Sequence, residues 1–399
     1  MEVMIALGAA CLLIRCGVAL YGTGLVRSKN AAASVLRAIC DLCVAALAFW
    51  AIGGAILTQS HSAIFSVDWR FVGFRAGEGA DLFFLTTVVL VGTGVAGSAM
   101  AERAQFFPLC CVSILLAAIV IPVGANWAWT GWLRHLGFID PAGGSWLHAS
   151  AAMCAAVGAA VVGARTGKYH RDGSASTIPG HNVPLAAVGA LTMLVGWIPY
   201  VAGCLLLNHG QALIGQAATT TLLCAAAAGF VAILLGRFRY GKPDVILTLI
   251  GFLGGLVAIT AAAGRVGAPS AVLIGAVAGV IVPVSAIWID LRFHLDDPLA
   301  VIATHGVGGA WGTIAAGLLI HGSASHRLHQ AGVQIVGLAA IGLLSAVLSF
   351  VLFALLRLTV RLRANEDEEF EGLDLAEHDI GAYPDFQQTM IKSYDLREA

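Results

Sequence analysis

The chain has 399 residues, of which 59% are hydrophobic and only 11% are charged, and its mean hydropathy is +0.87. Because soluble domains carry about 25% charged residues, this composition excludes an ordinary soluble globular protein. The net charge of −1 gives no electrostatic case for binding nucleic acid. We therefore expect an all-α integral membrane protein.

Eleven hydrophobic segments are long enough to cross a bilayer, since a membrane helix needs about 20 mostly apolar residues. In chain order they lie near residues 3–25, 38–58, 82–101, 107–128, 144–164, 183–207, 214–236, 245–263, 270–290, 299–320 and 332–357. The first has no basic region before it and no separate cleavage site, so we interpret it as a retained span. We expect a transmembrane domain over residues 1–360 and a cytosolic tail over residues 361–399.

Lys and Arg residues are distributed unevenly between the two sets of loops, and they favour the cytoplasmic side. With the N-terminus outside, the inner loops and the start of the tail hold fourteen of them: Arg27, Lys29, Arg37, Arg103, Arg165, Lys168, Arg171, Arg237, Arg239, Lys242, Arg292, Arg357, Arg361 and Arg363. The outer loops hold five: Arg70, Arg75, Arg134, Arg265 and Arg327. This bias predicts an N-terminus outside and a C-terminus inside.

Two histidines, His148 and His305, lie inside the fifth and the tenth predicted spans. Each follows an Asp-Pro pair, with its aspartate (Asp140 or Asp297) eight residues earlier. An ionisable residue in a span is costly and indicates a functional site. The two copies are five helices apart, an odd number, so we predict an inverted five-helix repeat (spans 1–5 and 6–10) followed by a long eleventh helix.

Helical geometry predicts that the two histidines meet. If each aspartate lies at its membrane boundary, eight residues at 1.5 Å rise place the imidazole about 12 Å deep, against a half-thickness of about 15 Å. The two spans enter from opposite sides, so both imidazoles reach the centre. Two independent structural histidines are the alternative, and the matched spacing favours a pair. Such a pair could carry a small polar molecule or relay a proton.

No pattern in the sequence indicates a metal site, a cofactor or an enzyme. The cysteines lie almost all in apolar segments, and Cys40 and Cys43 have CxxC spacing without a second pair or a nearby histidine. Paired carboxylates, a P-loop and a nucleophile–base set are also missing from the sequence. Conduction therefore fits the histidine pair better than catalysis does.

Six segments resemble the Amt/Mep/Rh family of ammonium transporters, and the bacterial Amt proteins most closely. They are Gly22-Thr-Gly-Leu-Val-Arg27-Ser-Lys29-Asn30, Ala101-Glu102-Arg103, Asp140 through His148, Gly241-Lys242-Pro243, Asp296-Asp297-Pro298 with His305 through Thr313, and Glu371 through His378. The resemblance covers nearly the whole chain in order. It implies eleven spans, an inverted repeat and a homotrimer with one pore per protomer, in the cell (inner) membrane and surrounded by lipid.

The resemblance also implies residue roles. His148 and His305 match the pore histidines, and Trp129 and Phe84 match the aromatic residues of an outer vestibule that recruits ammonium. Asp140 matches an acidic residue that supports this vestibule structurally. The family's mechanism then implies that ammonium, or methylammonium, loses its proton and passes the histidines as the neutral amine, while the proton is relayed separately.

Trp129 also has a physical reason to bind a cation that does not depend on the resemblance. It lies at the outer end of the fourth span, where an indole face attracts a cation by about 0.5–2 kcal/mol. The alternative is an aromatic residue of the interfacial belt.

Four positions depart from the family pattern. Val88 stands at a gate position where phenylalanine is usual, and Tyr200 stands at the other gate position, also commonly phenylalanine. Val201 replaces an asparagine, and Cys204 replaces a serine of the recruitment site. A thiol is a weaker hydrogen-bond acceptor than a hydroxyl, so these changes bear on affinity and selectivity.

Arg15 is unexpected, because it lies midway along the first span. Asp41 in the second span is the nearest candidate partner along the sequence, and snorkelling to the interface is the alternative.

The tail begins with basic residues and continues with Glu366-Asp-Glu-Glu369, a composition typical of a chain that leaves the membrane and enters solvent. The resemblance implies that the tail packs under the pore and couples protomers. Some family members bind PII-type signal proteins there, which makes such a protein a candidate partner.

Transport of ammonium or ammonia is the leading functional hypothesis. An ammonium receptor with little flux is the first alternative, motivated by the departures at Val88, Val201 and Cys204. A neutral-gas channel like the Rh proteins, for ammonia or carbon dioxide, is the second.

Overall fold

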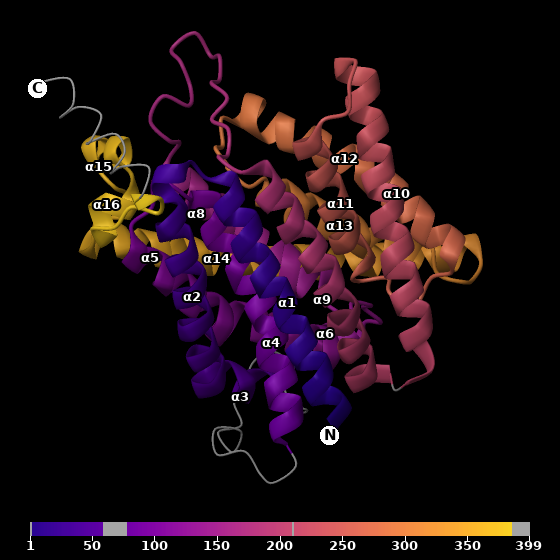
Figure 1. Ribbon diagram of the computed structural model, residues 1–399. Helices are drawn as coiled ribbons and strands as arrows, with labels where there is room; N and C mark the ends of the chain where they lie inside the picture. Colours follow the sequence, from indigo (N-terminus) through magenta and orange to yellow (C-terminus); the bar gives the residue numbers. More distant parts are fainter. Residues whose placement is uncertain (1, 59–77, 210, 385–399) are drawn as a thin grey trace, which may run out of the picture.

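Helices make up the regular secondary structure of the part of the chain that the computed structural model describes, residues 2–58, 78–209 and 211–384. Within these ranges, nine helical segments are long and apolar enough to cross a membrane. Figure 1 shows them packed side by side in one bundle. Their main helices are α1 (Glu2–Leu25), α2 (Ala31–Ala48) with α3 (Gly54–Leu57), α4 (Gly79–Ala96), α5 (Phe106–Leu115) with α6 (Ile121–Trp129), α8 (Ser150–Val162), α9 (Val183–His209), α10 (Ile214–Tyr240), α12 (Ala268–Phe293) and α14 (Ala324–Thr359).

Short helical turns extend or join these segments. They are η1 (Ser28–Asn30), η2 (Phe49–Gly53), η4 (Gly97–Met100), η5 (Leu116–Val120), α7 (Trp132–His135), η6 (Gly144–Ala149) and η7 (Gln211–Leu213).

Two shorter apolar helices occupy the remaining predicted spans. They are α11 (Val245–Ile259), within predicted span 245–263, and α13 (Gly308–Leu318), which continues from η8 (Ile302–Val307) within predicted span 299–320. Two predicted boundaries are wrong: the second segment begins at Ser28 rather than near 38, and α14 begins at Ala324 rather than near 332. In both cases the helix continues through polar residues beyond the hydrophobic stretch. The described residues thus form a helical bundle with the composition of a membrane protein, and eleven crossings remain a prediction.

Small residues let the helices approach at backbone distance. A Cβ added at Gly17 of α1 would lie 2.6 Å from the carbonyl oxygen of Gly189 in α9, and one added at Gly189 would lie 2.6 Å from that of Gly17. No side chain larger than hydrogen fits at either position. This contact joins the first helices of the two predicted halves, as small-residue packing in lipid requires.

Matching π-helical turns lie at the start of the fifth and the tenth predicted spans. They are η6 and η8, each six residues long, and each carries one of the two histidines. Single π turns within α-helices are rare and frequently accompany functional sites.

The bundle has two ends, which we call the N face, where α1 begins, and the tail face, where α15 (Glu366–Glu371) and α16 (Leu373–His378) lie (Figure 1). The tail is bound to the bundle. The two carboxylate oxygens of Asp374 accept the N–H groups of Ala32 and Ala33, at 3.1 and 2.7 Å. Glu377 forms an ion pair of 2.9 Å with Arg37.

Candidate functional site

The two histidines predicted to meet are in contact. Nδ1 of His148, on η6, lies 3.1 Å from Nδ1 of His305, on η8. His148 is completely buried and His305 is 9% exposed. Since each imidazole uses Nδ1 for its partner, one nitrogen donates and the other accepts, and both Nε2 atoms remain for other partners. Nε2 of His148 has no hydrogen-bond partner among the described residues.

The route by which these imidazoles reach each other differs from the expected one. The chain from Asp140 to Gly143 is a loop, and η6 begins only at Gly144. The assumed helical rise over all eight residues is therefore wrong, although the contact that it predicted is present.

Trp197 of α9 is a site residue that the sequence analysis missed. Its indole stacks on the His148 imidazole, with ring centroids 5.0 Å apart and planes inclined by 13°. Tyr200, one turn along α9, meets the same imidazole edge-on at 6.2 Å. Aromatic rings thus fix the orientation of His148.

A small cavity, which we call the lumen cavity, adjoins His305 toward the tail face. Its volume is about 20 Å³, and its lining includes Tyr21, Trp197, Leu299 and Thr304. This volume suffices for one molecule of the size of water. Most of its lining is apolar, which suits a neutral solute better than an ion.

A second cavity, the vestibule, lies on the N face. Its volume is about 50 Å³, and Trp129, Asp140, Arg134, Asn208 and Arg265 are among its lining residues. The half-buried Trp129 donates from Nε1 to the carbonyl oxygen of Asp140 at 3.3 Å. The predicted recruitment tryptophan therefore lines a cavity, beside two arginines that the sequence analysis did not associate with it.

Asp140 binds the first turn of the helix that carries His148. Its carboxylate accepts the N–H groups of Gly143 and Gly144 at 2.8 Å each and of Ser145 at 2.7 Å, together with the Ser145 hydroxyl. Asp140 is buried, so its carboxylate satisfies the free N–H groups of the helix start. These contacts fit a structural role.

The other predicted recruitment and gate residues are all buried on α4 and α9. The Phe84 ring packs against Gly203, next to Cys204. Tyr200 donates from its hydroxyl to the carbonyl oxygen of Ala142, between the vestibule and the histidines. Val88 lies one turn after Phe84 on the same face of α4.

Helix α14 holds the loop before Asp140 in place. The Gln334 side chain accepts the N–H of Ile139 at 2.8 Å and donates to its carbonyl oxygen at 2.6 Å. Gln330 donates to the carbonyl oxygen of Gly137 at 2.8 Å. Two glutamines four residues apart in an apolar segment are the signal that could have identified this clamp.

Buried charges connect three loops on the tail face. Arg165 binds both carboxylate oxygens of Asp296, at 2.8 and 2.9 Å, and lies 3.1 Å from Glu102. Burial alone would raise the pKa of Asp296, but the hydrogen bonds and the charge of Arg165 outweigh it and hold that pKa below its usual value. Burial lowers the pKa of the neighbouring Arg103 to about 10.

Asp297, by contrast, has little support. It accepts the N–H of Ile302 at 2.7 Å through Oδ2, while Oδ1 has no partner among the described residues. Burial raises the pKa of Asp297 to about 6.

Arg15 does pair with Asp41, as the sequence analysis suggested. The guanidinium also donates to the carbonyl oxygens of Leu90 at 3.1 Å and Ala38 at 3.0 Å, so it joins α1, α2 and α4. Asp41 accepts further hydrogen bonds from the hydroxyls of Thr93 and Ser113.

The cysteine pair Cys40 and Cys43 forms no common site in the structure. Cys40 lies 3.3 Å, sulfur to sulfur, from Cys110 of α5. Among the described residues, no group of three or more His, Cys, Asp or Glu side chains could hold a metal ion.

Comparison with known proteins gives one consistent result. A family profile described as "Ammonium Transporter Family" matches residues 2–383. The chain is 32% identical over 417 residues to "Ammonium transporter Amt2" of Archaeoglobus fulgidus, covering 95% of this chain and 87% of that relative. It is 31% identical over 395 residues to "Ammonium transporter" of Bacillus subtilis, covering 92% of this chain and 94% of that relative.

Solved structures share the fold. A chain titled "Sensor Amt Protein" superposes with a TM-score of 0.90 at 31% identity, covering 94% of this chain and 97% of the other. Mep2 of Saccharomyces cerevisiae superposes with a TM-score of 0.83, covering 92% and 89%, and its 24% identity makes it a comparison of fold alone.

Proposed function

Since the chain belongs to the ammonium transporter family and is a multi-pass membrane protein, we propose that it conducts ammonium-derived ammonia across the cell membrane through the space around His148 and His305. The observation that carries this proposal is the 3.1 Å contact between the two imidazoles, with the vestibule toward the N face and the lumen cavity toward the tail face. A neutral imidazole pair offers a donor and an acceptor without a fixed charge. Ammonia, which donates and accepts hydrogen bonds, matches that surface.

The vestibule recruits ammonium in this proposal. Trp129 supplies an indole face for the cation, and Phe84 and Cys204 belong to the same recruitment region. Asp140 keeps the helix start in place, through its bonds to three backbone N–H groups. Deprotonation follows before the molecule passes Tyr200, the proposed gate.

Val88 leaves the second gate position with a small side chain. Such a constriction admits molecules somewhat larger than ammonia, so methylammonium is an expected substrate.

The proposed topology follows from the charge bias of the loops. The N face lies outside and the tail face inside, with eleven crossings, two inverted halves of five helices and a long last helix. Residues 1–360 form the transmembrane domain, and residues 361–399 the cytosolic tail. A homotrimer with a tail that docks PII-type signal proteins completes the proposed assembly.

An ammonium sensor is the second candidate function. A solved protein titled "Sensor Amt Protein" matches this fold with a TM-score of 0.90 at 31% identity. In this chain the tail is held by direct bonds to α2 and to the loop after α8, through Asp374 and Glu369. A movement of α2 on ammonium binding would therefore also move the tail.

An ammonium concentration jump on proteoliposomes tests the proposal. Current across the membrane, a change of internal pH and binding of methylammonium are measured on the same preparation. A transporter with proton relay gives current and uptake. Binding without flux would establish the sensor, and a pH change without current would establish a neutral-gas channel.

A further inference from the structure

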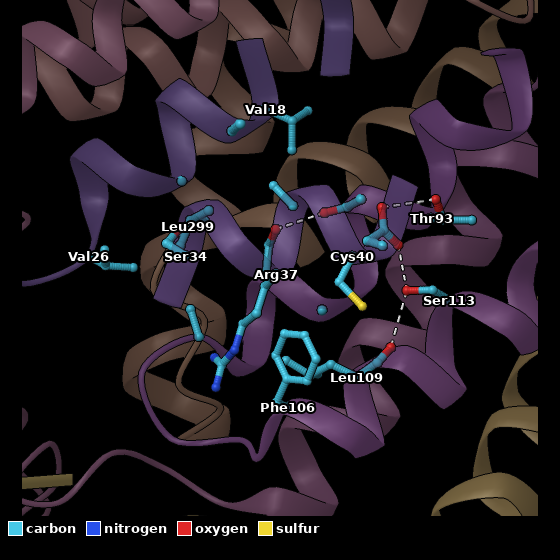
Figure 2. A pocket seen from close by; sticks show the side chains of 18 of the residues that line it. Val18, Val26, Ser34, Arg37, Cys40, Thr93, Phe106, Leu109, Ser113 and Leu299 are labelled. Atoms are coloured by element: carbon cyan, nitrogen blue, oxygen red, sulfur yellow. Dashed lines mark hydrogen bonds between the residues drawn. The ribbon is translucent and has the colours of Figure 1, made fainter. Parts of the chain in front are cut away.

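A cavity lies beside the histidine path, between α1, α2, α4 and α5. We call it the side cavity. Its volume is about 80 Å³, four times that of the lumen cavity. Figure 2 shows the side chains of Arg37, Cys40 and Phe106 around it, and dashed lines mark the hydrogen bonds of Thr93 and Ser113. It extends from the Arg15–Asp41 ion pair toward the residues that hold the tail.

Several polar atoms on the lining have no protein partner. Nε of Arg15, Nδ2 of Asn30 and Nε of Arg37 are buried donors without a hydrogen-bond acceptor among the described residues. A buried donor left unpaired costs about 1–3 kcal/mol. About 10–15 Å³ suffices for one water molecule, so a cavity of about 80 Å³ holds several, and water accepts from such donors. The side cavity is therefore suited to a chain of water.

The lining carries two basic side chains, Arg15 and Arg37, and two acidic ones, Asp41 and Glu102, and each is paired. Arg15 pairs with Asp41, and Glu102 is bound by Arg27 at 2.8 Å and by Arg165 at 3.1 Å. Arg37 pairs with Glu377 of the tail at 2.9 Å. The remaining titratable groups that face the space are the thiols of Cys40 and Cys110. The lining therefore adds no net charge to the space.

One thin wall separates the side cavity from the lumen cavity. Four residues line both spaces: Val18, Gly94, Ser98 and Leu299. Of these, Ser98 alone has a polar side chain. Its hydroxyl donates to the carbonyl oxygen of Gly94 at 2.8 Å, which leaves its oxygen free to accept.

We propose that the side cavity is the proton exit of the transporter and that Ser98 joins it to the lumen cavity. His305 gives the proton lost by ammonium to a water molecule below it, this water passes a proton to the oxygen of Ser98, and the serine releases its own proton to water in the side cavity. The hydroxyl then rotates back. Each ammonium thus crosses as one ammonia through the lumen and one proton through the side cavity, with one net positive charge transferred. This route rests on the proposed function.

Substitution of Ser98 tests the route. In proteoliposomes, Ser98→Ala should lower the current after an ammonium jump about tenfold, equivalent to about 1.4 kcal/mol in the barrier. Ser98→Thr keeps the hydroxyl and should restore most of the current. Ser285→Ala on α12 is the matched control, because that hydroxyl makes the same bond to the carbonyl four residues earlier, at 2.6 Å, and lines neither cavity.

Filling the side cavity is an independent test. Gly97 lines the side cavity but not the lumen cavity, and a Cβ added there would lie 3.7 Å from its nearest neighbour, on Leu109. Gly97→Val should therefore fold and should lower the current by displacing water. Gly342→Val, at a position with open space, is the control.

The outcomes separate the route from the function. Wild-type current in both Ser98→Ala and Gly97→Val would overturn the route and leave the proposed function intact. Equal losses in Ser98→Ala and Ser98→Thr would also overturn it, since the hydroxyl would then be irrelevant. A wild-type protein without ammonium-linked current would overturn the proposed function and the route together.

Discussion

Replacing Arg165 by methionine should destabilise the protein substantially. Arg165 makes two side-chain bonds to Asp296 and one to Glu102, at 2.8–3.1 Å, and all three residues are at most 5% exposed. Removing one partner from a buried ion pair costs about 3–5 kcal/mol, because a charge remains buried without compensation. Arg103 lies 3.8 Å from Asp296 and Arg27 still binds Glu102, so we expect the lower end of this range.

The assay is thermal unfolding in detergent. In domains half this size, each kcal/mol of lost stability lowers the unfolding midpoint by about 2–4 °C, and the effect is smaller in larger chains. Arg165→Met should therefore lower the midpoint by about 3 °C or more. Arg292→Met, at an exposed position of α12, is the control. A midpoint for Arg165→Met equal to that of the control would show that the Arg165 ion pairs do not stabilise the fold.

The same variant has a pH signature. The pKa of Asp296 in the folded protein is lower than its ordinary value of 3.8. Its stabilising contribution is therefore present above pH 3.8 and is lost as the pH falls through the folded pKa. The difference in stability between wild type and Arg165→Met should thus be largest at neutral pH and should shrink below pH 4.

Two further predictions concern the loop before each histidine. Asp297→Asn should stabilise the protein above pH 6 by about 3 kcal/mol. Burial raises the pKa of Asp297 from the ordinary 3.8 to about 6, and a difference of one in pKa corresponds to about 1.4 kcal/mol. The contribution of Asp297 to stability is favourable below pH 4 and is lost as the pH rises through 6. The unfolding midpoints of wild type and Asp297→Asn, measured from pH 4 to 8, should therefore converge at the acid end. A difference between them that does not change with pH would contradict this. Gln334→Leu removes both bonds to the Ile139 peptide and should raise the KM for methylammonium about fivefold, the equivalent of about 1 kcal/mol, with a smaller effect on kcat. An unchanged KM would show that this clamp does not position the vestibule.

Much of the helical framework could be predicted from hydropathy, because lipid requires every backbone group to be bonded within its own segment. The short segments α11 and α13 fall inside predicted spans for this reason. The π turns at η6 and η8 could not be predicted, since they depend on packing between segments far apart in the sequence. The starts of α2 and α14 were misplaced because these helices continue through polar residues.

The histidine contact could be predicted because a repeated spacing, Asp-Pro to His, marks equivalent positions in two segments. Trp197 could not, since an indole in an apolar helix has many equally suitable neighbours. Arg165 and Asp296 lie in different loops, 131 residues apart, and their pairing follows only from the fold. Arg15 was a clear anomaly in the first span, and the partner suggested for it, Asp41, is the one observed.

Transport by a variant without the imidazole pair tests whether the flux depends on His148 and His305. His148→Leu combined with His305→Leu replaces the two imidazoles by apolar side chains where the rings meet. His329→Leu, at an exposed position of α14, serves as the control. The double variant, folded and reconstituted, should carry no ammonium-linked current and take up no methylammonium. Uptake and current undiminished from those of the wild type would contradict this.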